Sequence, residues 1–492
     1  MQLVAYGAQD VYLSANPQIT FFKVVYRRHT NFAMESIEQV FNGSADFGRK
    51  VTATISRNGD LIHKAYLRVQ LPNVQVAAGD GFRWLDWVGH VLLKSVEIEI
   101  GGQRIDKHYG DWLHIWNELT QTAGHQLGYA NMVGNVPNLT QPTIVPAGTL
   151  TGQLPTVAGQ VLWIPLEFWW NRNPGLALPL IALQYHEVKI NIEFTQASYC
   201  YWAASSVSTT SAGGVTTIAM TGAPSGNYGN QISMASCSLF VDYIFLDTDE
   251  RRRFSAAAHE YLIEQLQFTG DESTNSANNK IKLSFNHPTK ELIWVCQVDE
   301  NVNTSAPPTY GPQWFNYTDG PDSSLSPSFP YNVNSPIFDP QGTATLATVG
   351  NNSMGGMPGV AAGGANGVYL PVSFSGGTNP CSQVLLQLNG HDRFSQRDGN
   401  YFSLVQPYQH HENVPKQGIN VYSFALKPEE HQPSGTCNFS RIDTAVLQLT
   451  LTAASVVNST TNSSRIVKIR VYAVNYNVLR IMSGMGGLAY SN

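Results

Sequence analysis

Short runs of alternating apolar and polar residues occur along most of the chain. Examples lie at residues 96–100 (VEIEI), 188–194 (VKINIEF), 281–285, 446–451 and 467–473. An alternation with period two places every second side chain on the same face, as in a half-buried antiparallel strand. The pattern therefore predicts an all-β protein built from many short strands.

One charge-dense segment, residues 247–268 (DTDERRRFSAAAHEYLIEQLQF), divides the chain nearly in half. Alternating runs lie on both sides of it, and 492 residues are many for a single core. We therefore expect two β domains of roughly 200–250 residues each, joined by a short polar connector. The arginines at 251–253 are expected to pair locally with the acids around them, which are Asp247, Asp249, Glu250 and Glu260.

Apolar residues spaced at i, i+3, i+4 and i+7 predict one helix outside the connector. Asp111 is its expected N-cap, and its apolar face carries Trp112, Ile115, Trp116 and Leu119. A pair of tryptophans could stack on a ligand, but we favour packing of this face against the first sandwich.

Three long stretches, residues 120–160, 198–231 and 299–377, show little periodicity and are rich in Gly, Pro, Ser, Thr and Asn. They are predicted to be loops, which at this length are usually functional or disordered. The third contains enough aromatic residues to order partly, namely Trp314, Phe315, Tyr317 and Tyr331.

The composition favours extensive contacts between subunits. Charged residues make up 13% of the chain, about half the share of a typical soluble protein. The 22 Tyr and 10 Trp residues suit interfaces, although all-β proteins are rich in Tyr in any case. The net charge is −6 and the basic residues are dispersed, so we expect no direct binding of nucleic acid.

The five cysteines are widely spaced and form no CxxC pair, so they predict neither a disulfide framework nor a zinc site. Asp10 interrupts the first weakly apolar stretch, so no secretory signal is expected, and synthesis in a reducing cytosol follows. The most apolar window, residues 176–183, is short and contains Pro179, so no membrane span is expected.

No catalytic, cofactor or metal site is expected. His410-His411-Glu412 could suggest metal ligation, but packing in a loop or at the surface is the favoured reading. His186-Glu187 and His259-Glu260 lack the second His of HExxH, and the GxGxxA match at 484–489 has no room for a following helix. A glycosidase would need two acids to converge, with four candidates: Glu167, Asp242, Asp299 and Glu412.

Eight Asn-x-Ser/Thr sequons occur, as expected by chance in a chain rich in Asn and Ser. Without a signal peptide, glycosylation is the less favoured reading. Asn303, Asn316 and Asn351 lie in the long 299–377 stretch and are the candidate sugar sites.

Four blocks of the sequence resemble the major capsid proteins of nucleocytoplasmic large DNA viruses, such as phycodnaviruses, iridoviruses, mimiviruses and marseilleviruses. They occur in family order and span almost the whole chain, at residues 5–43, 171–190 (NRNPGLALPLIALQYHEVKI), 247–268 and 433–444 (PSGTCNFSRIDT). The resemblance implies a double jelly roll, two antiparallel eight-stranded sandwiches side by side. It divides the chain into an N-terminal arm (1–30), a first jelly roll (31–247), a connector (248–260) and a second jelly roll (261–492).

The same resemblance implies a homotrimeric capsomer that contacts neighbouring capsomers in an icosahedral shell around a large DNA genome. The long loops would then form the outward-facing towers, and a penton protein, minor capsid proteins and a nearby internal membrane would be partners. The arm at residues 21–29 either contacts these partners or closes the first sandwich. A lectin-like β-sandwich that binds carbohydrate is the alternative, because the jelly roll is common to both.

Overall fold

The computed structural model describes residues 30–145, 150–205, 207–212, 215–220, 228–304, 311–321, 377–458 and 461–490. Among the residues outside these ranges are almost all of the expected N-terminal arm, Asn351 and most of the 299–377 stretch. None of the described helices is long and apolar enough to cross a membrane.

The first half of the chain forms two antiparallel sheets with a common apolar core. One sheet has the order β1-β16-β3-β10, with β11 also paired to β3, and the other has the order β2-β12-β6-β7. Their bounds are β1 (Phe32–Gln39), β16 (Ser236–Leu246), β3 (Leu61–Gln70), β10 (Val161–Pro165), β11 (Leu178–Pro179), β2 (Lys50–Thr54), β12 (Val188–Phe194), β6 (Leu93–Ile100) and β7 (Gln103–His108).

The second half repeats this architecture. One sheet has the order β17-β26-β19-β23, with β24 and β27 at its margins, and the other has the order β18-β25-β20-β21, with β22 also paired to β20. Their bounds are β17 (His259–Thr274), β26 (Val467–Met482), β19 (Pro288–Val298), β23 (Ile419–Ser423), β24 (Cys437–Asn438), β27 (Met485–Leu488), β18 (Asn278–Leu283), β25 (Ala445–Leu451), β20 (Cys381–Leu388), β21 (His391–Asp392) and β22 (Arg397–Asp398).

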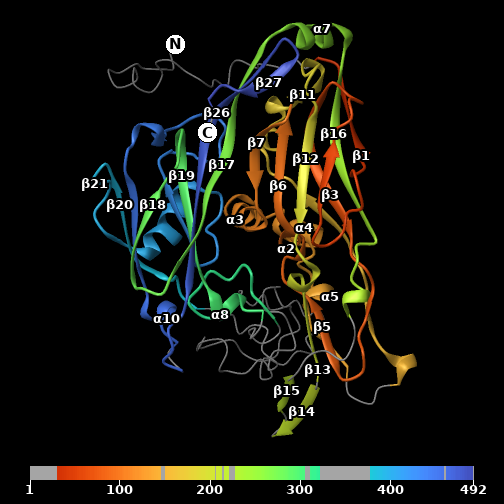
Figure 1. The fold of residues 1–492 in the computed structure, drawn as a ribbon, viewed down its shortest axis with the longest axis vertical. Coiled ribbons are helices and arrows are strands. Elements are labelled where there is room, and N and C mark those ends of the chain that lie inside the picture. Colours follow the sequence, from red (N-terminus) through yellow and green to blue (C-terminus); the bar gives the residue numbers. More distant parts are fainter. Residues whose placement is uncertain are drawn as a thin grey trace, which may run out of the picture.

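Each half is thus a sandwich with a four-strand path in each of its two sheets, as the double jelly roll requires. The alternating sequence accounts for the packing: in β12 and in β25 every second residue is buried, and the intervening ones are half-buried. The prediction of an all-β double jelly roll is confirmed. Figure 1 shows the two sandwiches side by side.

The connector is a helix followed directly by a long strand. Asp247 caps α7 (Thr248–Ala256) by accepting a hydrogen bond of 2.7 Å from the Thr248 amide. Local ion pairing is only partly confirmed. Arg253 contacts Glu250 at 3.7 Å, whereas Arg251 reaches back to Asp60 of the first sandwich at 3.0 Å.

The stretches predicted to be loops contain more regular structure than expected. Residues 120–160 include α4 (Gln126–Val133), α5 (Pro137–Thr140), β8 (Thr143–Ile144) and β9 (Thr156–Val157). Residues 198–231 include β13 (Tyr201–Ser205), which pairs with β5 (Asp80–Trp84), and a hairpin of β14 (Val207–Ala212) and β15 (Val215–Met220). No periodic pattern of apolar residues predicted these elements, because most of them are too short to contain a repeat.

The predicted helix is present as α3 (Gly110–Thr120), but its N-cap is Tyr109, so Asp111 lies in the first turn. The α-helical turns that were not predicted are short and include α2 (Val88–Leu92), α6 (Trp169–Arg172), α8 (Asp299–Val302), α9 (Gln406–His410) and α10 (Ala453–Val456). The helix α7 lies at one end of the molecule, and β13, β14, β15 and α8 lie toward the other (Figure 1).

Candidate functional site at the junction of the two sandwiches

A buried apolar contact joins helix α3 of the first half to a sheet of the second. The expectation that α3 packs on the first sandwich was wrong. Its apolar face, which includes Trp112 and Trp116, shares a buried cluster with Ile293, Val295 and Tyr472 of the second half. Among these contacts, the Trp112 and Tyr472 rings lie 5.6 Å apart.

Strand β19 supplies the surface that receives this helix. Leu292, Trp294 and Cys296 point into the core of the second sandwich, whereas Ile293 and Val295 point toward α3. The strand is therefore buried on both faces, and its residues 292–296 (LIWVC) form a continuous apolar run rather than an alternation. That run is the sequence signal from which the junction could have been inferred.

Polar contacts fix the register of the two halves along the junction. The amide of Leu266 in β17 donates to the carboxylate of Asp106 in β7 at 3.1 Å, and the Gln265 side chain donates to the carbonyl oxygen of Ile105. At the other side of α3, Arg470 of β26 binds Asp111 at 2.5 Å and Asp271 at 3.0 Å. Such directional bonds set orientation, which apolar packing alone does not.

A buried ion network lies where α6 meets β17 and β19. Glu264 binds Arg172 of the first half at 2.9 Å and Lys290 of the second half at 2.8 Å. The Arg172 guanidinium also stacks 4.0 Å from the centre of the Trp116 ring. Burial would raise the pKa of Glu264, but the charges of Lys290 and Arg172 and a contact with His431 outweigh it and lower the pKa to about 2.

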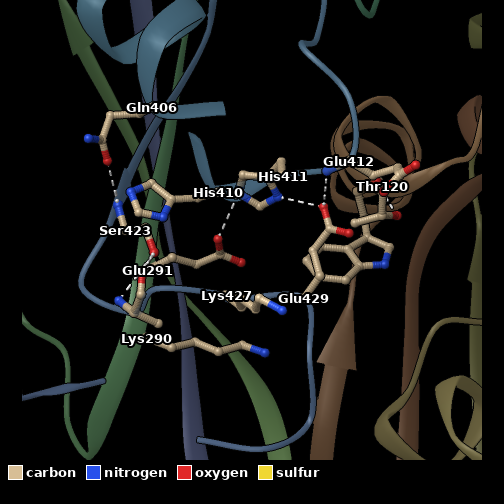
Figure 2. Close-up of polar contacts among 12 residues, drawn as sticks. Thr120, Lys290, Glu291, Gln406, His410, His411, Glu412, Ser423, Lys427 and Glu429 are labelled. Carbon is tan, nitrogen blue, oxygen red and sulfur yellow. Dashed lines mark hydrogen bonds and ion pairs between the residues drawn. The ribbon is translucent and has the colours of Figure 1, made fainter. Parts of the chain in front are cut away.

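His411 forms a second buried ionic contact beside this network. Its side chain has no solvent exposure and lies between two carboxylates, 3.0 Å from Glu291 and 2.8 Å from Glu429 (Figure 2). Burial lowers the pKa of this histidine, but the two glutamates raise it further, to a net value of about 9. The imidazole is therefore a cation at neutral pH. His410 ends α9 and the His411 side chain is buried at the junction, which the expected packing in a loop or at the surface did not specify.

The segment that follows His411 binds the carboxyl end of α3. The Asn413 amide donates to the carbonyl oxygen of Leu119 at 3.0 Å, and its side chain donates to the carbonyl oxygen of Gln121. Lys416 lies 3.9 Å from Glu118. The last carbonyl oxygens of a helix have no hydrogen-bond partner within the helix. Here the second half of the molecule supplies hydrogen bonds to the carbonyl oxygens at the end of α3.

A polar cavity of about 310 Å³ lies at the edge of the junction. Its walls come from both halves and combine acids, bases and amides, including Lys64, Asn117, Glu167, Arg172 and Glu429. Burial is the largest influence on Glu167 and raises its pKa, against the opposing charge of Arg172. The cavity does not gather the four acids considered for a glycosidase, since only Glu167 is among its lining residues.

The other candidate residues have structural roles. Gly486 belongs to the β26–β27 hairpin rather than to a nucleotide-binding turn, and its amide and carbonyl group contact the His186 ring at 3.2 and 3.0 Å. His259 binds the carbonyl oxygen of Phe254 at 2.7 Å. Asp299 pairs with Lys468 at 3.1 Å. Among the described residues, no group of three or more His, Cys, Asp or Glu side chains is arranged to hold a metal ion.

Two of the three candidate sugar sites lie among the described residues. Asn303 is exposed just after α8. The side-chain amide of Asn316 donates hydrogen bonds to Gln313 at 2.8 Å and to the carbonyl oxygen of Gly320 at 2.9 Å. The atom that would carry a sugar at Asn316 is thus already engaged.

Sequence reasoning missed one pair of cysteines. The sulfur atoms of Cys296 in β19 and Cys381 in β20 lie 3.4 Å apart, although the residues are 85 positions apart in the chain. No spacing rule could have found this pair, because it forms only when the two sheets of the second sandwich pack together.

Comparison with known proteins gives the same assignment for both halves. A family model described as "Major capsid protein N-terminus" matches residues 20–247, and one described as "Large eukaryotic DNA virus major capsid protein" matches residues 250–487. The major capsid protein of Phaeocystis pouchetii virus is 53% identical over 547 aligned residues, which cover 100% of this chain and 99% of that protein. The major capsid protein of Paramecium bursaria Chlorella virus 1 is 42% identical over 517 residues, with the same coverage.

Solved structures agree with these matches. The crystal structure of PBCV-1 VP54, which was fitted into a reconstruction of the virophage Sputnik, is 38% identical and covers 96% of this chain and 100% of its own, with a TM-score of 0.67. The Faustovirus major capsid protein has a TM-score of 0.68 at 16% identity, which shows the shared fold. The lectin and glycosidase alternatives have no support among these relatives. The chain therefore belongs to the major capsid proteins of large eukaryotic DNA viruses and is a structural component of the virion capsid, not an enzyme.

Proposed function

We propose that three copies of this chain form a homotrimer with a nearly hexagonal outline, and that these trimers tile the flat facets of an icosahedral shell around a large DNA genome. The observation that carries the proposal is the junction. Because buried ionic and apolar contacts hold the two sandwiches side by side, each chain supplies two similar wedges in a fixed orientation. Three chains then supply six wedges around one axis.

Exposed apolar side chains on the two sandwiches suit the contacts between subunits. On the first sandwich, Phe32 and Met34 lie two residues apart on one face of the edge strand β1, and both are about half exposed. On the second, Tyr408 and Leu426 are 80% and 73% exposed, and His410 beside Tyr408 bonds to the Leu426 carbonyl oxygen. A three-fold ring joins two different patches, so the β1 patch of one chain would meet the α9 patch of the next.

The loops at the end of the molecule opposite α7 are the proposed outer surface. Trp314, in the described base of the 299–377 stretch, donates a hydrogen bond of 2.9 Å to the carbonyl oxygen of Tyr199 in the first half. It also packs against the cluster of Leu85 and Trp202. Insertions from both sandwiches thus meet at one end, which supports a single tower region per chain.

Further partners follow from the geometry of the shell and from the family. Hexagonal units tile a plane, so a closed shell needs five-fold vertices, which we assign to a separate penton protein. Minor capsid proteins and an internal membrane would lie beneath the facets, with the N-terminal arm as the proposed contact. Direct contact with the genome is not proposed, because the net charge is −6. Synthesis in the host cytoplasm is consistent with five cysteines that are all free.

Light scattering on the purified full chain tests the trimer. We expect a mass about three times the chain mass of 54.0 kDa. Met34→Asp or Tyr408→Asp should shift the protein to a folded monomer, because each places a charge in an apolar contact. Leu150→Asp is the matched control, since Leu150 is 69% exposed and lies outside both patches. A wild-type protein that remains monomeric would refute the proposal.

Salt gives a second test of the same contact. Apolar burial is insensitive to ionic screening, so the trimer should persist at about 1 M salt. Dissociation into folded monomers under that condition would show that the contact is mainly electrostatic and that the two patches were assigned wrongly.

Mass spectrometry tests whether the protein is glycosylated. Asn303 is the proposed acceptor among the described candidates, because it is exposed. The intact mass of virion protein before and after enzymatic removal of N-linked sugars, compared with the same measurement on an Asn303→Gln variant, tests whether Asn303 is modified.

A further inference from the structure

The thiols of Cys296 and Cys381 face each other across the core of the second sandwich. Cys296 lies in β19 and Cys381 in β20, which belong to opposite sheets. Their sulfur atoms are 3.4 Å apart and both residues are buried, with 0% and 2% exposure. A disulfide bond is about 2.0 Å long, so small torsional changes in two side chains would bring the sulfurs within bonding distance.

We propose that Cys296 and Cys381 are a latent cross-link, which forms an inter-sheet disulfide when the chain leaves the reducing cytoplasm and meets a small-molecule disulfide. The proposal does not depend on the trimer, because both cysteines belong to the core of one chain.

The chemistry requires one equivalent of oxidant. One cysteine loses its proton to solvent and attacks a sulfur of the oxidant R–S–S–R, which breaks the oxidant's S–S bond, forms a mixed disulfide and releases one thiolate. The second cysteine, also deprotonated, attacks the protein sulfur of that mixed disulfide and releases the second thiolate. The released thiolates take up the two protons. The two cysteines are oxidised to one cystine, and the oxidant is reduced by two electrons to two R–SH.

Burial determines when this reaction occurs. The hydrogen bond to Cys381 and the absence of solvent both raise the pKa of Cys296, so the folded, closed protein contains little thiolate. Exchange must therefore occur during folding or during a local opening that separates β19 from β20. Once formed, the buried disulfide would be protected from reductants by the same core.

The position of the pair suggests what the bond does. Cys296 and Cys381 flank the long insertion at 299–377, whose base is already closed by hydrogen bonds between Asp319 and Thr378 at 2.6 and 3.1 Å. A disulfide beneath this base would restrict the unfolded chain over a closed loop of 85 residues. The bond would thus stabilise the second sandwich against unfolding that begins at its largest insertion.

Counting thiols in the full chain tests the proposal. The protein is incubated or refolded with oxidised glutathione, alkylated in denaturant and analysed by mass spectrometry under non-reducing conditions. We expect three alkylated cysteines and one peptide pair that links Cys296 to Cys381 and is two hydrogens lighter than its reduced form. Five alkylated cysteines, a stable glutathione adduct at either position, or a bond to another cysteine would each overturn the proposal.

Thermal unfolding with and without the oxidant provides the functional readout. Oxidation should raise the melting temperature of the wild type by roughly 5–15 °C. Each variant is compared only with its own reduced form, so a loss of core packing does not confuse the result. Cys296→Ala and Cys381→Ala should lose the shift, whereas Cys200→Ala, which removes a buried thiol from the other sandwich, should keep it. An equal shift in all three variants would refute the cross-link.

Discussion

At the scale of single residues, the junction depends on charges that are buried but paired. Glu264 contacts both Lys290 and Arg172, and His411 lies between Glu291 and Glu429. A buried ion pair adds little net stability compared with apolar residues of the same shape, but removing one partner is costly because the other charge remains desolvated. These residues therefore specify how the two halves fit.

Stability should fall at alkaline pH through His411. Its folded pKa of about 9 lies above the ordinary value of 6.5. The stabilisation is therefore complete below about pH 6.5 and is lost as the pH rises through about 9. His411→Gln should cost about 3 kcal/mol at neutral pH and remove this alkaline decline. Urea unfolding between pH 6 and 10 measures both effects.

His410→Gln is the matched control for that variant, because His410 is the neighbouring histidine and bonds only to a backbone carbonyl oxygen among the contacts described. It should leave the alkaline decline in place. If the two variants behave alike, the decline comes from another group.

Glu264 should control the acid side of the stability profile. Its folded pKa of about 2 lies below the ordinary 4.5, so its contribution is present above about pH 4.5 and is lost as the pH falls toward 2. Glu264→Gln should cost about 3 kcal/mol at neutral pH, because Lys290 keeps a buried charge without its counter-ion. Glu260 lies on β17 like Glu264, and Glu260→Gln, which removes an exposed pair with Arg480 of β26, should cost less than about 1 kcal/mol. Equal losses would argue against the buried network.

At the scale of elements, the second sandwich separates a replaceable insertion from an essential core turn. The insertion enters and leaves through Asp319 and Thr378, which are hydrogen-bonded to each other. By contrast, Phe439 in the turn before β25 is 2% exposed and packs against Phe285 and Phe424. Phe439 therefore belongs to the buried cluster that anchors β25 in the second sandwich.

Deleting residues 322–376 should therefore preserve soluble, folded protein, because the ends of the deleted segment already lie together. Phe439→Ala should lower the free energy of unfolding by about 3–5 kcal/mol, since it leaves a cavity in the core. Soluble yield and urea unfolding measure both. Loss of the deletion variant alongside an unaffected Phe439→Ala protein would reverse the assignment of loop and core.

At the scale of the whole molecule, the two sandwiches form one structural unit rather than two independent domains. Helix α3 of the first half completes a buried cluster of the second, and Ile263, Leu479 and Ile481 of the second half belong to the core of the first. An interface that is this apolar resists relative motion between domains. In a shell built from such units, the angle between the two sandwiches of each chain would be fixed.

Separating the halves should expose the α3 face. The fragment 1–256 expressed alone should aggregate, because Trp112 and Trp116 become exposed to solvent without the second half. Co-expression with 257–492 should restore a soluble complex of both fragments, detected by size-exclusion chromatography. Replacing Trp112 and Trp116 by Ser in the isolated fragment should reduce aggregation. A wild-type 1–256 fragment that is monomeric and soluble would contradict the proposed role of the junction.

The amino-acid sequence alone was enough to predict the longer alternating strands and the presence of α3. These depend on local patterns: alternation in β12 and β25, and the i, i+3, i+4, i+7 spacing in α3. Three features depend on tertiary packing: α3 packs on the second half, His411 lies between two glutamates, and Cys296 faces Cys381. Each of these joins residues far apart in the chain, and a periodic pattern shows that a face is buried without showing what covers it.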